Sequence, residues 1–203
     1  MHVSRRRFLS AGSITTVGAL AGCLGGNSTG PDEPLSTPVK GAAEAPVTVE
    51  SFEDFTCKFC RQFALEILPQ IEANYIEPGT VRFIRHDFPF LDEEWSWKTA
   101  YAARAVQDMQ GQEVFYEYVD LLYQNFDSYS IELFGNLAES VGADPETVRT
   151  AVADERYLQT LEAEKSLGEE TDVTKTPTVL VDGERPESPR YDDVAAAIDA
   201  KIQ

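Results

Sequence analysis

Two cysteines, Cys57 and Cys60 in the run SFEDFTCKFCRQF, constrain this chain more than any other feature. A short apolar run precedes them and a helical pattern follows, so the first cysteine falls at a helix N-terminus. Unpaired N–H groups and the helix dipole favour a thiolate there, and the second cysteine follows one turn later, within reach of a disulfide. In such settings a cysteine pKa of roughly 8.5 falls to about 3.5–7.5. The motif therefore indicates thiol–disulfide exchange, with Lys58 adding positive charge nearby.

The first 23 residues have the layout of an export signal. Arg5, Arg6 and Arg7 precede a mild apolar stretch that is too short and too rich in Gly, Ser and Thr for a comfortable membrane span. SRRRFL resembles the twin-arginine signal and LAGC, ending at Cys23, resembles a lipobox. These resemblances imply export of a folded protein, cleavage before Cys23 and lipid attachment to its sulfur. We therefore predict a signal peptide over 1–22, in preference to an ordinary basic N-terminus with an incidental cysteine.

The composition changes after Cys23. Residues 23–40 are rich in Gly, Ser, Thr and Pro and have little to bury, which predicts a flexible tether to a lipid-anchored domain outside the cell membrane. Asn27 begins an Asn-Ser-Thr triplet, a glycosylation acceptor in exported proteins, and whether it is modified stays open. The remaining residues, 41–203, have the size of one domain.

Acidic residues outnumber basic ones by 35 Asp and Glu to 17 Lys and Arg, for a formal net charge of −18. The acids are spread along the chain while the apolar periodicity is kept, so we expect a dense acidic surface over a normal core. Such a surface is typical of halophilic proteins, because concentrated salt screens its self-repulsion. The charge favours a haloarchaeal source over another acidic protein, and it argues against nucleic-acid binding, which needs a basic face.

Periodicity predicts a β-α-β unit at the start of the domain. Strands are expected over 47–52 and 80–85, with a helix over 57–75 between them that Pro69 should kink. Such a unit implies a parallel strand pair with a right-handed crossover.

The rest of the domain is predicted to be helical and then β again. Amphipathic patterns fill about 92–170, and their aromatic residues have the spacing of a packed core. Asp144 and Pro145 have the features of an N-cap and a first helical residue. A strand over 176–181, a short strand from Arg185 and a helix over 191–202 complete the chain.

This element order and four segments resemble the DsbA-like branch of the thioredoxin superfamily, in which a helical domain interrupts a thioredoxin fold. The segments are APVTVESFEDFTCKFCRQF, VRFIRHDFPF, YAARA and TKTPTVLVDG, and the resemblance covers nearly all of 41–203. It implies an α/β, thioredoxin-like fold with a helical insertion at about 92–170.

The resemblance also implies roles for individual residues. Cys57 corresponds to the attacking thiol and Cys60 to the resolving thiol. Pro177 matches the family's cis-proline, which lies against the active-site disulfide, although an ordinary trans proline at a strand edge is the alternative. Thr176 would then expose backbone groups beside Cys57, where an extended substrate could pair strand-wise.

The dipeptide between the cysteines departs from the family pattern. Many members have Pro and often His there, whereas this chain has Lys58 and Phe59. The dipeptide tunes thiolate stability and hence redox potential, so the oxidising strength stays open. Phe59 would supply an apolar contact for unfolded or extended substrates.

The sequence therefore predicts a thiol–disulfide oxidoreductase acting on exported proteins, with oxidation as the default direction because disulfides persist outside the cell. An isomerase or reductase, and a non-catalytic surface-binding lipoprotein with a structural disulfide, are the alternatives. We expect no cofactor and no metal, since a zinc site needs about four ligands and the histidines are His2 and His86. Glu53, Asp54 and Asp87 are expected to be solvated acids rather than proton relays. The substrates and a membrane recycling partner stay open.

Overall fold

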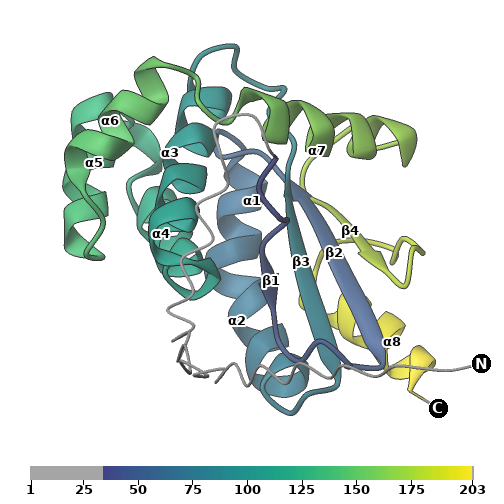
Figure 1. Ribbon diagram of the computed structural model, residues 1–203. Helices are drawn as coiled ribbons and strands as arrows, with labels where there is room; N and C mark the ends of the chain where they lie inside the picture. The colour runs from purple at the N-terminus through teal and green to yellow at the C-terminus, as the bar shows by residue number, and fades with distance from the viewer. Residues whose placement is uncertain (1–33, 203) are drawn as a thin grey trace, which may run out of the picture.

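The computed structural model describes residues 34–202, and a four-stranded sheet in the order β1-β3-β2-β4 lies at its centre (Figure 1). The strands are Val39–Lys40 (β1), Val47–Glu53 (β2), Val81–Asp87 (β3) and Thr178–Val181 (β4). β2 and β3 run parallel, whereas β1 pairs antiparallel with β3 and β4 antiparallel with β2. The predicted parallel pair is confirmed, and each of its strands continues beyond the predicted end.

A continuous helical segment connects β2 to β3. It consists of α1 (Lys58–Gln62), a π-helical turn (Phe63–Ile67), α2 (Leu68–Ile71) and a second π-helical turn (Glu72–Ile76). Pro69 falls in the first turn of α2, directly after the first wide turn. A wide turn is a recognised way of accommodating an interruption of the regular hydrogen-bond ladder. The interruption expected at Pro69 therefore takes the form of π-helical turns.

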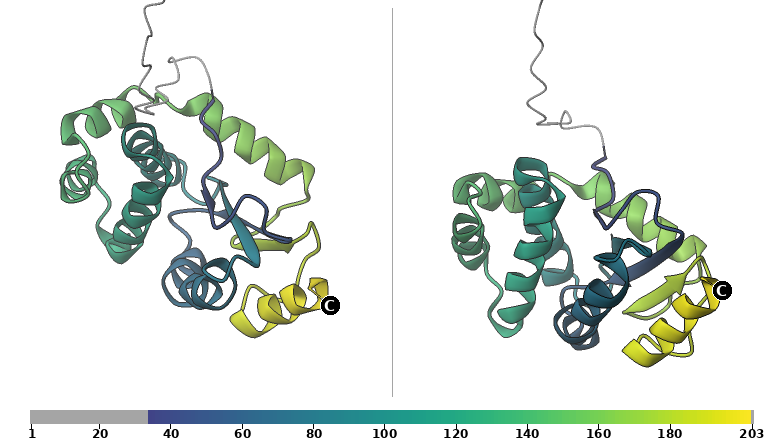
Figure 2. Two further views of the ribbon diagram at one scale, coloured as in Figure 1. Left: turned by 60° about the horizontal axis from the view of Figure 1, so that its bottom comes forward. Right: turned by 90° about the horizontal axis from the view of Figure 1, so that it is seen from below.

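Five α-helices form the insertion between β3 and β4. They are α3 (Trp95–Gln110), α4 (Gln112–Gln124), α5 (Ile131–Ser140), α6 (Pro145–Ala153) and α7 (Leu158–Glu170), with a 3₁₀ turn at Phe126–Ser128. The Asp144 carboxylate accepts a hydrogen bond from Thr147 N at 2.7 Å, and Pro145 is the first helical residue, as predicted. In both views of Figure 2, α3 to α6 gather on one side of α1 and α2, while β4 and α8 (Tyr191–Lys201) lie on the other.

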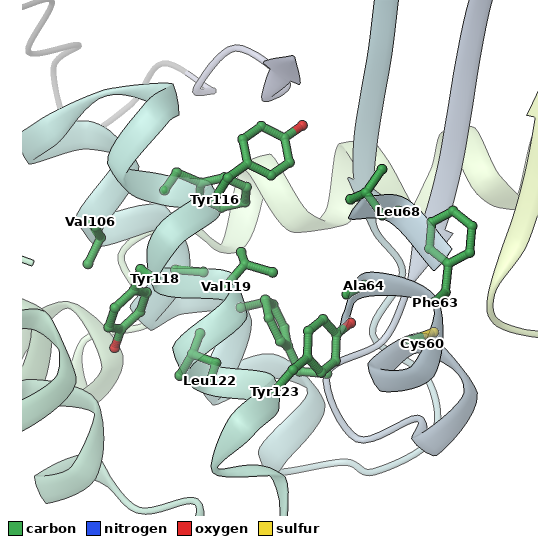
Figure 3. Packing of buried hydrophobic residues seen from close by; sticks show 14 of the residues in the cluster. Cys60, Phe63, Ala64, Leu68, Val106, Tyr116, Tyr118, Val119, Leu122 and Tyr123 are labelled. Carbon is green, nitrogen blue, oxygen red and sulfur yellow. The ribbon is translucent and has the colours of Figure 1, made fainter. Parts of the chain in front are cut away.

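Aromatic side chains of the insertion pack against the helical segment of the β-α-β unit. Figure 3 shows Tyr123 and Val119 of α4 facing Ala64 and Cys60, within one buried cluster that extends from the sheet into the insertion. The prediction that these aromatic residues pack in the core is confirmed. The helix that carries both cysteines is thus held between the sheet and the inserted helices.

No helix within residues 34–202 is both long and apolar enough to span a bilayer.

The predicted tether is wrong over residues 34–40. Pro38 O accepts hydrogen bonds from Arg85 N at 3.2 Å and from Tyr116 Oη at 3.1 Å, and Ser36 O accepts one from Gln107 Nε2 at 2.7 Å. Local composition does not indicate that this segment is ordered, because its hydrogen-bond partners lie far along the chain. The predicted signal peptide, Cys23 and Asn27 lie outside the described residues.

The strand predicted from Arg185 is also wrong. In the described part of the chain, an isolated bridge between Val181 and Glu184 replaces it. The Arg185 guanidinium donates instead to Thr171 O at 2.8 Å and to Asp172 O at 2.7 Å, at the end of α7. Pro186 and Pro189 lack the N–H groups that a strand needs for pairing, which disfavours a further strand between β4 and α8.

Candidate active site

The two cysteines lie where β2 passes into α1. Cys57 is the N-cap residue of α1 with extended backbone angles, φ −87° and ψ 115°. Its N–H donates to Asp54 O at 3.0 Å, and its carbonyl accepts from Arg61 N at 3.0 Å. Both cysteines are free thiols and both are buried, Cys60 completely. The start of the helix therefore places Cys57 toward the surface and Cys60 one turn deeper, as expected.

The turn that precedes β4 lies against Cys57. The Thr176–Pro177 peptide bond is cis, and the Cys57 Sγ–H donates to Thr176 O at 3.2 Å. Sheet pairing brings these distant residues together, because Thr178 of β4 lies opposite Phe52 near the end of β2. The predicted cis bond and the predicted proximity of the two segments are both present.

The environment drives the pKa values of the two thiols apart. A hydrogen bond from the Cys60 thiol, with weaker ones from the N–H groups of Cys60 and Phe59, outweighs burial and lowers the pKa of Cys57 to about 6. Burial raises the pKa of Cys60 well above its ordinary value, and the hydrogen bond to Cys57 and the charge of Glu53 raise it further. Cys57 is thus suited to exist as a thiolate while Cys60 keeps its proton.

Lys58 and Phe59 lie together at the start of α1. The Lys58 ammonium lies 5.0 Å from the centre of the Phe59 ring, and the ring is 57 % exposed. Phe59 therefore presents the apolar surface expected beside the cysteines. Hydrogen bonds are the largest influences that lower the pKa of Cys57, and the Lys58 charge is not among them.

The three acids near the cysteines are buried, so the expectation that they are solvated is wrong. Glu53 and Asp87 lie opposite each other at the ends of β2 and β3, and Asp54 follows directly; each is 1 % exposed. Burying three carboxylates requires compensating donors or charges. For Glu53 and Asp87 these come from two arginines that are themselves buried.

We call Glu53, Arg85, Asp87, Arg104 and Glu164 the buried ion cluster. Arg85 pairs with Asp87 and lies 3.6 Å from Glu53, while Arg104 pairs with Glu164 and places Nε 2.8 Å from Asp87 Oδ2. Burial alone would raise the pKa of Asp87, but the two guanidinium groups outweigh it and hold that pKa below the usual range. The cluster joins β2 and β3 to α3 and α7 directly behind the cysteines.

The loop after β3 carries a second exposed apolar surface. Phe90 and Leu91 are 39 % and 51 % exposed, and Phe88 packs on Phe90 with ring centroids 5.3 Å apart. Their backbone N–H groups bind Asp54, which connects the loop to the turn that carries Cys57. Sequence reasoning missed these two residues as site residues; the signal was an apolar run continuing beyond the end of a strand.

Comparison with known proteins decides the family. The family model described as thioredoxin matches residues 34–200. The chain belongs to the thioredoxin family. Within this family it is similar to disulfide bond formation protein D of Bacillus subtilis, at 26 % identity over 82 % of this chain and 77 % of the relative. It is also 29 % identical to Na(+)/H(+) antiporter NhaA 3 of Salinispora tropica, but the match covers 78 % of this chain and only 24 % of that protein.

Solved structures agree with this assignment. Oxidised BdbD from Bacillus subtilis superposes with a TM-score of 0.77 at 26 % identity, covering 82 % of this chain and 92 % of that one. DsbA from Chlamydia trachomatis gives a TM-score of 0.73 at 20 % identity, over 85 % and 94 % of the two chains, which supports the fold. This thioredoxin-family chain is a protein thiol–disulfide oxidoreductase with a DsbA-like fold.

The lowered pKa of Cys57 predicts how the thioredoxin-family site responds to pH. Iodoacetamide labelling of the reduced protein should follow a midpoint near the Cys57 pKa of about 6, because the thiolate is the reacting form. This pKa lies below the unfolded value of roughly 8.5, so ionisation stabilises the reduced fold increasingly as pH rises between the two values and is lost as pH falls through 6.

The matching control is Cys57→Ala, which lacks the titrating group. The difference in free energy of unfolding between reduced wild type and this variant should grow between about pH 6 and 8.5. Denaturant titrations at several pH values measure it. A labelling midpoint near 8.5 would contradict the hydrogen-bonded thiolate.

Proposed function

We propose that this chain oxidises thiols of exported proteins, with Cys57 as the exchanging sulfur and Cys60 as the resolving one. The observation that carries the proposal is the contrast between the two thiols. Cys57 has its pKa lowered to about 6 beside the Thr176 turn, while Cys60 is fully buried with its pKa raised. Cys57, the less buried of the two sulfurs, would therefore be the one that a protein substrate attacks.

The proposed reaction proceeds from the oxidised pair. A substrate thiolate attacks Cys57 Sγ, the Cys57–Cys60 bond breaks, and Cys60 leaves and takes up a proton. A second substrate thiolate then attacks the substrate sulfur of the mixed disulfide and releases the Cys57 thiolate. Two electrons pass from the substrate dithiol to the cysteine pair, and a membrane acceptor of unknown identity reoxidises the pair.

The low pKa of Cys57 favours oxidation over reduction. A thiolate stabilised in the reduced enzyme makes Cys57 a good leaving group and shifts the equilibrium toward the reduced pair, which is the property of a strong oxidant. An isomerase or reductase remains the alternative, and the reduction potential separates them.

Substrate binding is proposed to use the surface beside Cys57. Thr176 and Pro177 would offer backbone groups to an extended substrate, and the exposed ring of Phe59 would contact an apolar side chain next to the reacting cysteine. Lys58 would remain solvated at the edge of this surface.

The test is a measured reduction potential together with an oxidation assay. In glutathione redox buffers at high salt, we expect a potential above about −200 mV, closer to DsbA-type oxidants than to the roughly −270 mV of thioredoxin. The oxidised protein should also form disulfides stoichiometrically in reduced, unfolded ribonuclease. A potential near −270 mV with no oxidation of ribonuclease would favour a reductase.

We also propose that residues 1–22 are a twin-arginine signal, that Cys23 carries the lipid, and that residues 23–33 tether a domain over 34–203 with its helical insertion at about 92–170. The SRRRFL and LAGC sequences support export and anchoring, and the acidic composition supports a haloarchaeal source. Cys23→Ser should release the protein from membranes or leave it unprocessed. Fractionation of cells that express each form measures this, and unchanged membrane association would contradict lipidation.

A further inference from the structure

Acidic and aromatic side chains line a hollow of about 400 Å³ between the start of α3 and the start of α7. Two of them, Trp97 and Tyr101, lie one turn apart on α3, with ring centroids 6.3 Å apart. The others come from the loop before α3, from the turn before α7 and from α7 itself. We call Glu93, Trp97, Tyr101, Glu155, Leu158 and Glu162 the acidic cleft.

The acidic cleft carries negative charge that the described chain leaves unpaired. At its edge Lys98 Nζ lies 2.6 Å from Glu94 Oε1, so these two charges compensate each other. Within residues 34–202, the carboxylates of Glu93, Glu155 and Glu162 form no ion pair. Three like charges around one hollow repel one another, and a bound cation would relieve that repulsion.

Tyr101 lacks a hydrogen-bond partner although it is buried. The residue is 3 % exposed and lines the cleft, and its hydroxyl forms no hydrogen bond with any of residues 34–202. Burial and the charges of Glu155 and Glu162 raise the pKa of Tyr101 to about 12, so the hydroxyl keeps its proton at neutral pH. Buried polar groups normally have a partner, and a tyrosine hydroxyl can accept a hydrogen bond from an N–H group. The hydroxyl therefore indicates a ligand that brings N–H donors.

The Trp97 ring adds a preference for a flat cation. The Lys165 ammonium lies 5.3 Å from the centre of this ring, so the indole already attracts a cation from within the chain. An aromatic ring has two faces, and a guanidinium group stacks on such a face while its N–H groups bind carboxylates. Exposed ion pairs are weakened by salt, whereas stacking on the indole is less sensitive to it. Arginine therefore fits the cleft better than lysine does.

The acidic cleft lies at the same end of the molecule as Cys57. Ser96, which directly precedes Trp97, places its hydroxyl 2.9 Å from Thr56 Oγ1, and Thr56 directly precedes Cys57. In Figure 1, α7 and the start of α3 lie at the end of the sheet where α1 begins. A polypeptide that reacts at Cys57 can therefore continue over the first turn of α3 into the cleft.

We propose that the acidic cleft binds the guanidinium group of an arginine in the polypeptide that the enzyme oxidises, at a fixed distance along that chain from the reacting cysteine. Glu155 and Glu162 would accept its N–H groups together with the Tyr101 hydroxyl, and Trp97 would stack on its plane. The proposal rests on the oxidase function proposed above and names a class of substrate for it.

Binding is tested first without any redox reaction. The indole N–H signals of Trp95 and Trp97, the two tryptophans of the chain, are followed by NMR, and Trp97→Phe assigns them. Acetyl-arginine amide should shift the Trp97 signal, whereas the neutral isostere acetyl-citrulline amide should not. No shift of Trp97 with the arginine compound, or equal shifts with both compounds, would overturn the site.

Kinetics then test the role in substrate selection. The substrates are peptides with two cysteines and one arginine placed at increasing distance from them, with glutathione disulfide to regenerate the enzyme. At the best spacing the KM should be about tenfold lower than for the citrulline peptide, the size of one stacked and ion-paired cation. In concentrated salt the arginine peptide should keep a lower KM than the lysine peptide. Equal KM values for the arginine and citrulline peptides at every spacing, or for the arginine and lysine peptides in concentrated salt, would contradict the proposed selection.

Paired variants separate the cleft from the general acidity of the protein. Glu155→Gln with Glu162→Gln should abolish most of the difference between the arginine and citrulline peptides. Glu169→Gln with Glu170→Gln is the matched control, because it removes the same charge from exposed positions at the other end of α7 and should leave the difference intact. Equal effects of the two pairs would show long-range attraction only and would overturn the cleft. Tyr101→Phe, which removes only the hydroxyl, should raise the KM of the arginine peptide about threefold.

The two experiments separate this inference from the function on which it rests. A protein that oxidises neither the peptides nor dithiothreitol contradicts the oxidase function, while the Trp97 signal still reports whether the cleft binds a guanidinium group. A protein that oxidises both, but does not distinguish arginine from citrulline, contradicts this inference alone.

Discussion

Cys57→Ser should reduce thiol–disulfide exchange to the background rate, and Cys60→Ser should accumulate a mixed disulfide between Cys57 and a substrate. The asymmetry follows from burial and ionisation, because Cys60 is completely buried with a raised pKa while Cys57 has a lowered one. Without Cys60, nothing inside the protein remains to displace the substrate from Cys57. Non-reducing electrophoresis and mass spectrometry measure the trapped species after each variant is incubated with a peptide disulfide, because the Cys57 thiolate attacks one sulfur of the peptide and the other sulfur leaves as a thiol.

The double variant Cys57→Ser with Cys60→Ser is the control for exchange by other routes. Retention of exchange by Cys57→Ser, with its loss in Cys60→Ser, would reverse the two roles. Full activity in both single variants would show that the pair is not the exchanging group.

Arg104→Met should lower the free energy of unfolding by about 3–5 kcal/mol, the usual cost of removing one partner from a buried ion pair. Arg104 donates to Asp87 Oδ2 at 2.8 Å and to Gln107 Oε1 at 2.9 Å, and it also pairs with Glu164. Its loss leaves the buried ion cluster with three carboxylates and one guanidinium group. Urea unfolding at constant salt, followed by circular dichroism, measures the change.

Arg190→Met is the matched control, because Arg190 is exposed and its side chain forms no ion pair in the described chain. It should change the free energy of unfolding by less than about 0.5 kcal/mol. Concentrated salt should not rescue Arg104→Met, since buried charges are screened far less than exposed ones. A loss below about 1 kcal/mol for Arg104→Met would contradict the importance of the cluster.

Hydrophobic periodicity and capping residues predicted those strands and helices whose signals lie within a few neighbouring residues. The strands beginning at Val47 and Val81, the capped helix after Asp144 and the C-terminal helix follow from periodicity and capping within a few residues. The cysteine pair and the cis bond before Pro177 followed from a motif and a family resemblance.

The sequence did not predict the features that depend on contacts between residues far apart in the chain. β1 contains two residues, and its neighbours are bound by side chains from α3 and α4, which no local pattern reveals. In a chain with 35 acidic residues, Glu53, Asp54 and Asp87 look like surface acids. Their burial had one sign in the sequence: Arg104 falls inside the apolar run YAARAV, where a charge needs a buried partner.

The buried ion cluster has a mechanical consequence. It draws charges from β2, β3, α3 and α7 into one set of contacts across the boundary between the sheet and the inserted helices. A hinge motion at that boundary would break buried ion pairs without exposing the separated charges to water. The sheet and the inserted helices are therefore expected to move as one rigid body. Under the proposed function, polypeptides of different shape would then be accommodated by rotamer changes in the few exposed aromatic and leucine side chains near Cys57. The enzyme would then adapt to its substrates through side-chain movements on a rigid backbone.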